Sequence, residues 1–226
     1  MSFWNKWFTP PRQQPPVVHQ YLQAFDQKAD RKSPVDQLHF VVFDTETSGL
    51  DPHKAHLLSL GAVAVHQQSI LIGHSLEMTA FAPGSEIQDN VAIHGITRRE
   101  LQEGADEAVI LEKWLSFIGN SILVAHHVAF DLAIMNRLCK RYYGIKIKNT
   151  VLDTAHLARR LEQGTQLDEY IKPEEYSLDL LCERYGIRPD DRHTAAGDAY
   201  ITAQLLLKLL AQARKKGIRT YSDLLR

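Results

Sequence analysis

Hydrophobic positions change their spacing near residue 39, where a polar stretch broken by prolines gives way to short apolar runs. The run 39–44 is rich in β-branched and aromatic residues, which is typical of a buried strand. Two more apolar runs, 57–65 and 70–81, follow after short polar breaks. Tight breaks favour antiparallel neighbours, so the first three strands are expected to form a meander.

Helical periodicity takes over after the third strand and alternates with two more short strands. We expect helices at 107–118, 130–142, 154–162, 177–185 and 195–214, and strands at 122–125 and 150–153. A meander followed by strand–helix–strand crossovers gives a mixed sheet. The pattern therefore predicts an α/β fold, with a mixed five-stranded sheet flanked by helices.

Residues 1–37 differ from the rest of the chain. We interpret them as an N-terminal extension, partly flexible, ahead of a main domain at 38–226. Its prolines are Pro10, Pro11, Pro15, Pro16 and Pro34. One short helix is expected between Val17 and Lys28.

Two features of the extension bear on partners. Its aromatic residues Trp4, Trp7 and Phe8 are expected to pack on the main domain or, alternatively, on another protein. The stretch Gln20–Phe25 loosely resembles short peptides that bind sliding clamps. A sliding clamp or a DNA polymerase is therefore a candidate partner.

The amino-acid composition excludes some classes of protein but does not indicate a function. The 226 residues are 44% hydrophobic and 23% charged, with a formal net charge of -1, so no global positive field marks a nucleic-acid binder. The two cysteines lie in apolar helical patterns, which fits a reducing compartment. There is no apolar run of about 18 residues and no signal-peptide pattern. We expect a cytoplasmic protein with no membrane segment.

The first candidate site follows the first strand. Asp44 and Glu46 are two residues apart, and residues with this spacing in a strand point to the same face. Both carboxylates can therefore converge on one cation at the end of the strand, where α/β sheets form their sites. The alternative is an ordinary solvated turn.

A second acid, Asp131, stands in the first turn of the helix that follows the strand 122–125. Taken alone, it would be expected only to complement the helix dipole. The third segment contains His193 and Asp198, five residues apart, which is about 140° around an ideal helix. They would not share a helical face, so His193 is expected on the loop that precedes the helix.

Together these four acids and one histidine fall at strand ends and helix starts that are expected to meet in one crevice. Hard oxygen ligands suit Mg²⁺ or Mn²⁺ rather than Zn²⁺. Two such ions about 4 Å apart would clamp a phosphodiester during displacement. The adjacent pair His126 and His127 lacks the partners and spacing of a zinc site.

The three segments, Asp44–Leu50, Val124–Asp131 and His193–Tyr200, resemble the three motifs of the DEDDh (DnaQ-like) 3′→5′ exonucleases, which include the epsilon subunit of DNA polymerase III. The similarity covers residues 38–212 and implies a ribonuclease H-like fold. It implies that four acids hold two metal ions, Mg²⁺ or Mn²⁺, and that His193 deprotonates the attacking water. Those acids are Asp44, Glu46, Asp131 and Asp198.

The resemblance also implies contacts with the terminal nucleotide. The matching residues are Thr45, Thr47, Leu50, His94 and Phe130. Two positions depart from the family pattern: His127 replaces a usual Asn, and Ser59 replaces a frequent Glu. Asp153, in a segment that matches a structural element of the family, is interpreted as structural, with a site role as the alternative.

The expected function is removal of nucleoside 5′-monophosphates from single-stranded or frayed DNA 3′ ends, in proofreading or repair. An RNA 3′-end trimming enzyme is the alternative, and a non-catalytic interaction module is a more distant one. Basic residues after the second motif either contact the substrate backbone or merely solvate the surface. These residues are Arg137, Lys140, Arg141, Lys146 and Lys148.

Overall fold

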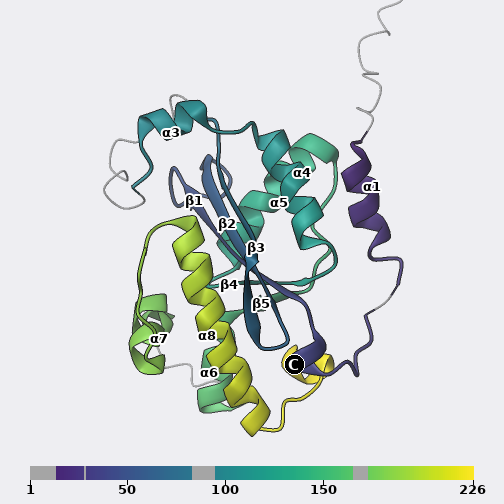
Figure 1. The fold of residues 1–226 in the computed structure, drawn as a ribbon, viewed down its shortest axis with the longest axis vertical. Coiled ribbons are helices and arrows are strands. Elements are labelled where there is room, and N and C mark those ends of the chain that lie inside the picture. The colour runs from purple at the N-terminus through teal and green to yellow at the C-terminus, as the bar shows by residue number, and fades with distance from the viewer. Residues whose placement is uncertain (1–13, 28, 83–94, 165–172) are drawn as a thin grey trace, which may run out of the picture.

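A mixed sheet with the strand order β3-β2-β1-β4-β5 runs through the centre of the molecule (Figure 1). The computed structural model describes residues 14–27, 29–82, 95–164 and 173–226. The strands are β1 Phe40–Thr47, β2 Leu57–His66, β3 Ser69–Thr79, β4 Ile122–Ala125 and β5 Val151–Asp153. The meander β1, β2 and β3 is antiparallel, whereas β4 and β5 run parallel to β1. The predicted five-stranded mixed sheet is therefore confirmed.

Helices cover both faces of this sheet (Figure 1). The α-helices are α1 Pro16–Gln23, α3 Arg98–Glu103, α4 Glu107–Ile118, α5 Ala129–Tyr143, α6 Thr154–Gln163, α7 Leu178–Tyr185, α8 Ala195–Lys215 and α9 Tyr221–Leu224, and the short 3₁₀ turns are η1 Val35–Gln37 and η2 Pro173–Tyr176. One core cluster lies between the sheet and α6, α7 and α8. The other lies between the sheet and α4 and α5, with α1 against its outer side. Within the described part of the chain, no helix is long and apolar enough to cross a membrane.

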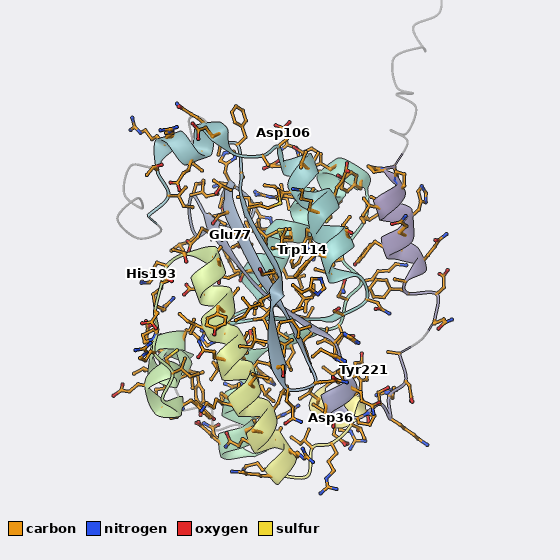
Figure 2. All side chains as sticks on the ribbon, viewed as in Figure 1. Asp36, Glu77, Asp106, Trp114, His193 and Tyr221 are labelled. Carbon is orange, nitrogen blue, oxygen red and sulfur yellow. The ribbon has the colours of Figure 1, made fainter. Side chains whose placement is uncertain are left out.

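Strand β1 shows why the sheet is buried on both sides. Phe40 and Val42 belong to the cluster under α8, whereas Val41 and Phe43 belong to the cluster under α4 and α5. Phe43 packs on Trp114, which lies between α4 and the sheet (Figure 2). This alternation follows from the period of two along a strand.

The helix expected in the N-terminal extension forms and packs on the domain. Val18 and Tyr21 of α1 are buried. The Tyr21 hydroxyl donates a hydrogen bond to Asn149 Oδ1 (2.7 Å) and accepts one from the Lys148 amide (2.7 Å). Trp4, Trp7 and Phe8 lie outside the described residues.

The sequence pattern missed several short elements. Helix α3 begins at a capping box, in which Thr97 and Glu100 satisfy each other's backbone amides. This spacing of Thr and Glu is a recognised helix start, so α3 was detectable from the sequence. The turns η1 and η2 and the helix α9 span four residues or fewer, too short to show a helical period.

A close backbone contact sets the position of α8 on the sheet. Gly61 of β2 lies opposite Asp44 in the antiparallel register. A Cβ atom on Gly61 would lie 2.2 Å from the carbonyl carbon of Ala195, the first residue of α8. The helix can approach the sheet this closely only because residue 61 has no side chain.

We expect Gly61→Ala to lower the free energy of unfolding by about 1–3 kcal/mol, because the new methyl group would collide with the α8 backbone. Gly73→Ala in β3 is the matched control, since nothing lies within 4 Å of a Cβ atom there. That control should stay within about 0.5 kcal/mol of the wild type. Urea unfolding of the two variants makes the comparison, and equal stability would contradict the close contact.

Candidate metal centre

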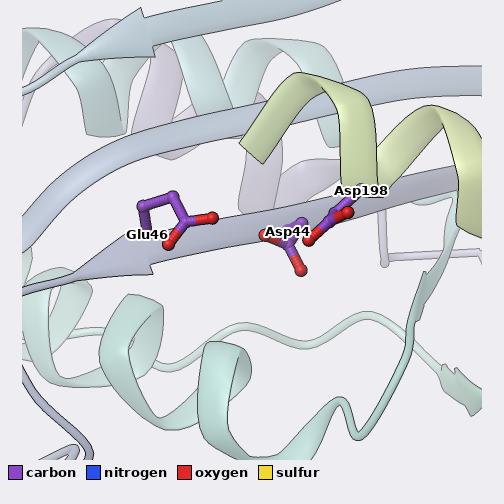
Figure 3. A group of neighbouring side chains, drawn as sticks. All are labelled: Asp44, Glu46 and Asp198. Carbon is purple, nitrogen blue, oxygen red and sulfur yellow. The ribbon is translucent and has the colours of Figure 1, made fainter. Parts of the chain in front are cut away.

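Three carboxylates meet at the carboxyl end of β1. Asp44 and Glu46 come from β1 and Asp198 from the first turn of α8 (Figure 3). Each offers one oxygen, and these oxygens lie within 4.8 Å of one another. Asp44 and Glu46 share the α8 side of the strand, as their spacing predicts.

The start of α8 is built to hold Asp198 in place. Thr194 caps the helix: its hydroxyl accepts from the Gly197 amide (3.0 Å) and donates to the Asp191 carbonyl (2.9 Å). A Cβ atom on Gly197 would lie 2.0 Å from the Asp191 carbonyl oxygen, so the loop folds directly onto the first turn. Asp198 follows on this turn and is buried.

Asp131 approaches the same strand end from the opposite face. It is buried in the first turn of α5, where its Oδ1 accepts hydrogen bonds from the Thr45 amide (3.0 Å) and the Thr45 hydroxyl (2.5 Å). Thr45 points to the α5 side because it alternates with Asp44 and Glu46. Asp131 lies outside the group of three, but its charge acts on Asp44.

His193 lies on the loop that leads into α8, as the sequence predicts (Figure 2). Its backbone is in the left-handed region (φ 64°), its side chain is exposed, and it is not a member of the carboxylate group. Asp191 in the same loop also has a positive φ (58°). Asp and His tolerate this conformation better than most residues.

The burial of several acids at one point shifts their protonation. Burial raises the pKa of Asp44 well above its ordinary value, and the charges of Asp131, Asp198 and Glu46 raise it further. The pKa of Glu46 is raised to about 7, mainly by burial and then by Asp198 and Asp131. Burial also raises the pKa of Asp131 to about 6, against the hydrogen bonds from Thr45. The site therefore favours a bound cation or a bound proton.

Arg192 is a cation at this site that the sequence analysis did not single out. Its Nε donates to Asp179 Oδ1 (2.7 Å), and its Nη1 donates to both carboxylate oxygens of Asp198. The positive charge of Arg192 lowers the pKa of Asp44 and of Glu46. An arginine directly before His193, in the segment that carries Asp198, was the available indication in the sequence.

The donor set fits a hard divalent cation. It consists of carboxylate oxygens close enough to share an ion, which suits Mg²⁺ or Mn²⁺. Among the described residues this is the one group of its kind. His126 is outside it: its Nδ1 bonds the Thr154 hydroxyl (2.9 Å), and burial lowers the pKa of the ring to about 4.

Four of the five residues expected to contact substrate are described by the structure, and their exposure differs. Leu50 is 93% exposed, just beyond β1. Thr47 donates to the Gly49 carbonyl (2.9 Å), and Phe130 is partly buried at the start of α5. Thr45 is buried and its hydroxyl bonds Asp131. His94 lies outside the described residues.

The two departures from the family pattern have local explanations. His127 has φ 59°, and His is among the residues that enter the left-handed region readily, as Asn does. Ser59 lies opposite Glu46 in the register, so no further acid is added there. Asp153 caps α6 through the amides of residues 155 and 156 and accepts from the Val128 amide (2.9 Å), which are structural bonds.

Comparison with known proteins gives a family. A model described as Exonuclease (RNase_T) matches residues 41–206, well over half of the chain. The PolC-type DNA polymerase III of Thermotoga petrophila is 33% identical over 186 residues, which are 82% of this chain but 13% of that protein. The DNA polymerase III subunit epsilon of Aquifex aeolicus is 33% identical over 189 residues, 83% of this chain and 88% of that protein.

Solved structures share the fold. Escherichia coli exonuclease I in complex with a dT13 oligonucleotide superposes with a TM-score of 0.61 at 18% identity, covering 80% of this chain and 43% of that one. Its complex with a dA16 oligonucleotide gives a TM-score of 0.61 at 19% identity, covering 79% and 42%. The fold is the ribonuclease H-like one that was expected.

The raised pKa values predict how the metal-free protein responds to pH. A carboxyl group whose pKa is higher in the folded state stabilises the fold at low pH, and this contribution is lost as the pH rises through the folded value. In EDTA the melting temperature should therefore fall as the pH rises from about 4, where carboxyl groups titrate in the unfolded chain, to about 7.5, just past the folded-state values of about 6 for Asp131 and about 7 for Glu46.

Glu46→Gln should reduce this decline, because it removes one of the titrating groups. Glu77→Gln, at an exposed site on β3, is the control and should leave the decline unchanged. Melting curves of the three proteins across the pH range test the prediction. An identical decline for Glu46→Gln and the wild type would show that Glu46 is not one of the groups responsible.

Proposed function

The chain belongs to the exonuclease family, and on that premise we propose that it removes nucleoside 5′-monophosphates from single-stranded or frayed DNA 3′ ends with divalent metal ions. The observation that carries this proposal is the carboxylate group of Asp44, Glu46 and Asp198, with their oxygens within 4.8 Å of one another. A scaffold without catalysis has no use for so many acids in a partly or fully buried position, because removing carboxylates from water is costly.

The four acids are proposed to hold two ions, Mg²⁺ or Mn²⁺. Asp44 lies between Glu46 and Asp198 (Figure 3), and Asp131 is proposed to support the site from α5. When bound, such ions supply Lewis acidity and neutralise charge on the phosphate. Thr45 fixes the Asp131 carboxylate through its amide and its hydroxyl, so that this carboxylate needs little reorganisation.

His193 is proposed as the general base. It accepts a proton from the water that attacks the terminal phosphorus atom. A new P–O bond forms, the bond to the 3′ oxygen of the shortened strand breaks, and this oxygen takes a proton from solvent to become the new 3′-hydroxyl. The loop position of His193 suits this role, because an exposed side chain beside the site can approach when a strand end is bound. Catalytic contacts of this kind often tighten only in the complex with substrate.

DNA is the preferred substrate. The relatives named above are DNA polymerase III proteins, and the structural neighbours include a complex with a DNA oligonucleotide. Contact with the terminal nucleotide is proposed for the residues that match the family's contact positions. These are Thr45, Thr47, Leu50, His94 and Phe130. RNA remains the alternative substrate, which a matched RNA strand tests.

A DNA polymerase is the proposed partner, since the PolC-type relative carries the matching segment within a polymerase. A sliding clamp is a second candidate through Gln20–Phe25. Tyr21 is 2% exposed and its hydroxyl is bonded to Asn149, so this segment would have to leave the domain before a clamp could bind it.

Asp198→Asn should lower the rate of shortening of 5′-labelled single-stranded DNA more than about 100-fold in Mg²⁺ or Mn²⁺, since it removes a proposed metal ligand but keeps the side-chain shape. Glu77→Gln is the control and should behave as wild type. A matched RNA strand and an EDTA reaction complete the assay. If wild type shortens neither strand in either metal, the exonuclease proposal fails.

His193→Ala should lower kcat about 10²–10⁴-fold and leave weak metal-dependent activity, because the metal ligands are intact. The pH dependence of kcat should flatten at the same time. Equal activity of the variant and the wild type between about pH 6 and pH 9 would rule out the general-base role.

A further inference from the structure

The loop between α7 and α8 carries an arginine whose guanidinium group bonds two acids at once. Arg192 donates through Nε and Nη2 to Asp179 of α7 (2.7 and 3.3 Å) and through Nη1 to both oxygens of Asp198. The side chains of Arg192 and Asp198 are 19% and 10% exposed, whereas that of Asp179 is 63% exposed. The guanidinium therefore spans from solvent to the buried centre.

This arrangement partly balances the charge of the carboxylate group. Buried carboxylates at this spacing repel one another, and each needs a neighbouring positive charge or a proton. Arg192 supplies a positive charge that opposes the rise in the pKa of both Asp44 and Glu46. In the metal-free protein it does part of what a bound cation would do.

The same contact conflicts with metal binding. Nη1 occupies both Asp198 oxygens, one of which the carboxylate group would offer to an ion. A guanidinium at hydrogen-bond distance from Asp198 also repels a divalent cation in a poorly screened site. Asp179 provides a second acceptor, bonded to Nε, that can keep the arginine beside the site after it releases Asp198.

We propose that Arg192 is an exchangeable counter-ion for the metal centre: it holds Asp198 in the metal-free protein, competes with the divalent ion for this carboxylate, and withdraws towards Asp179 when the ion binds. This inference rests on the proposed metal site and adds a residue that sets its affinity. The simpler role is a structural clamp between α7 and α8. The two roles differ in what they predict for metal affinity.

The test is calorimetric titration of the 226-residue chain with MnCl₂, without nucleic acid. Arg192→Gln should bind Mn²⁺ at least about fivefold more tightly than wild type, because the competing cation is gone. Arg192→Lys keeps the charge and should stay closer to wild type. Arg188→Gln is the matched control: this neighbouring arginine is 88% exposed and pairs with Asp190, away from the centre.

Asp179→Asn should have the opposite effect and weaken Mn²⁺ binding, because it removes the acceptor towards which Arg192 withdraws. Melting curves add a second measurement. Arg192→Gln should be less stable than wild type in EDTA, and Mn²⁺ should remove most of this difference, whereas a clamp would lower stability equally in both conditions.

Failure of the counter-ion role and failure of the metal site give different results. If wild type binds Mn²⁺ but Arg192→Gln binds no more tightly, or if its stability loss persists in Mn²⁺, the counter-ion role is wrong and the metal site stands. If wild type shows no Mn²⁺ binding, the metal site and the counter-ion role fail together.

Discussion

The first turn of α8 packs onto β2 at a point where no side chain fits, and the candidate site depends on this contact. Gly61 lies opposite Asp44 in the sheet register, and Ala195 of α8 rests directly on it. Asp198, three residues after Ala195 in the same first turn of α8, is thereby carried over the end of β1. A larger residue in β2 would lift the helix and separate the two acids. The geometry of the carboxylates is thus set by backbone packing before any ligand is involved.

That packing creates an electrostatic cost, because it brings acids together out of water. The pKa of Asp44 is raised well above its ordinary value and that of Glu46 to about 7. Ionisation of both carboxyl groups is therefore unfavourable in the metal-free protein. Burial, rather than repulsion between neighbours, is the larger cause for both groups. A bound divalent cation offsets both the burial of the carboxylates and the repulsion between them. The site therefore favours a cation more than an exposed acidic patch does. The grouping of these acids lowers the stability of the fold and favours metal binding, a trade-off that is common at functional sites.

Most of the fold could be predicted because its signals are local and periodic. The helix 107–118 and the strand 122–125 were placed with the bounds of α4 and β4, and the shared face of Asp44 and Glu46 followed from the period of two. Helix α3 was missed although its capping box was present, and α9 was too short to show a period. Arg192 and its bond to Asp179 were not predictable in this way, because α7 and the following loop meet only in the folded chain. For the same reason sequence spacing does not place Asp131 on the far side of β1 from Asp198.

The loop before α8 carries both the arginine that bonds Asp198 and the histidine proposed as the general base. Arg192 and His193 are consecutive, and the loop that carries them is fixed at its base by the Thr194 cap and the Asp191 carbonyl on Gly197. Because Asp191 and His193 both have positive φ, the backbone turns sharply on either side of Arg192 and directs the two side chains differently. The arginine is turned inward onto Asp198, whereas the histidine is exposed. Any withdrawal of Arg192 from Asp198 acts on the same short backbone that positions His193. If the proposed roles hold, occupation of the metal centre and placement of His193 are linked through one peptide unit.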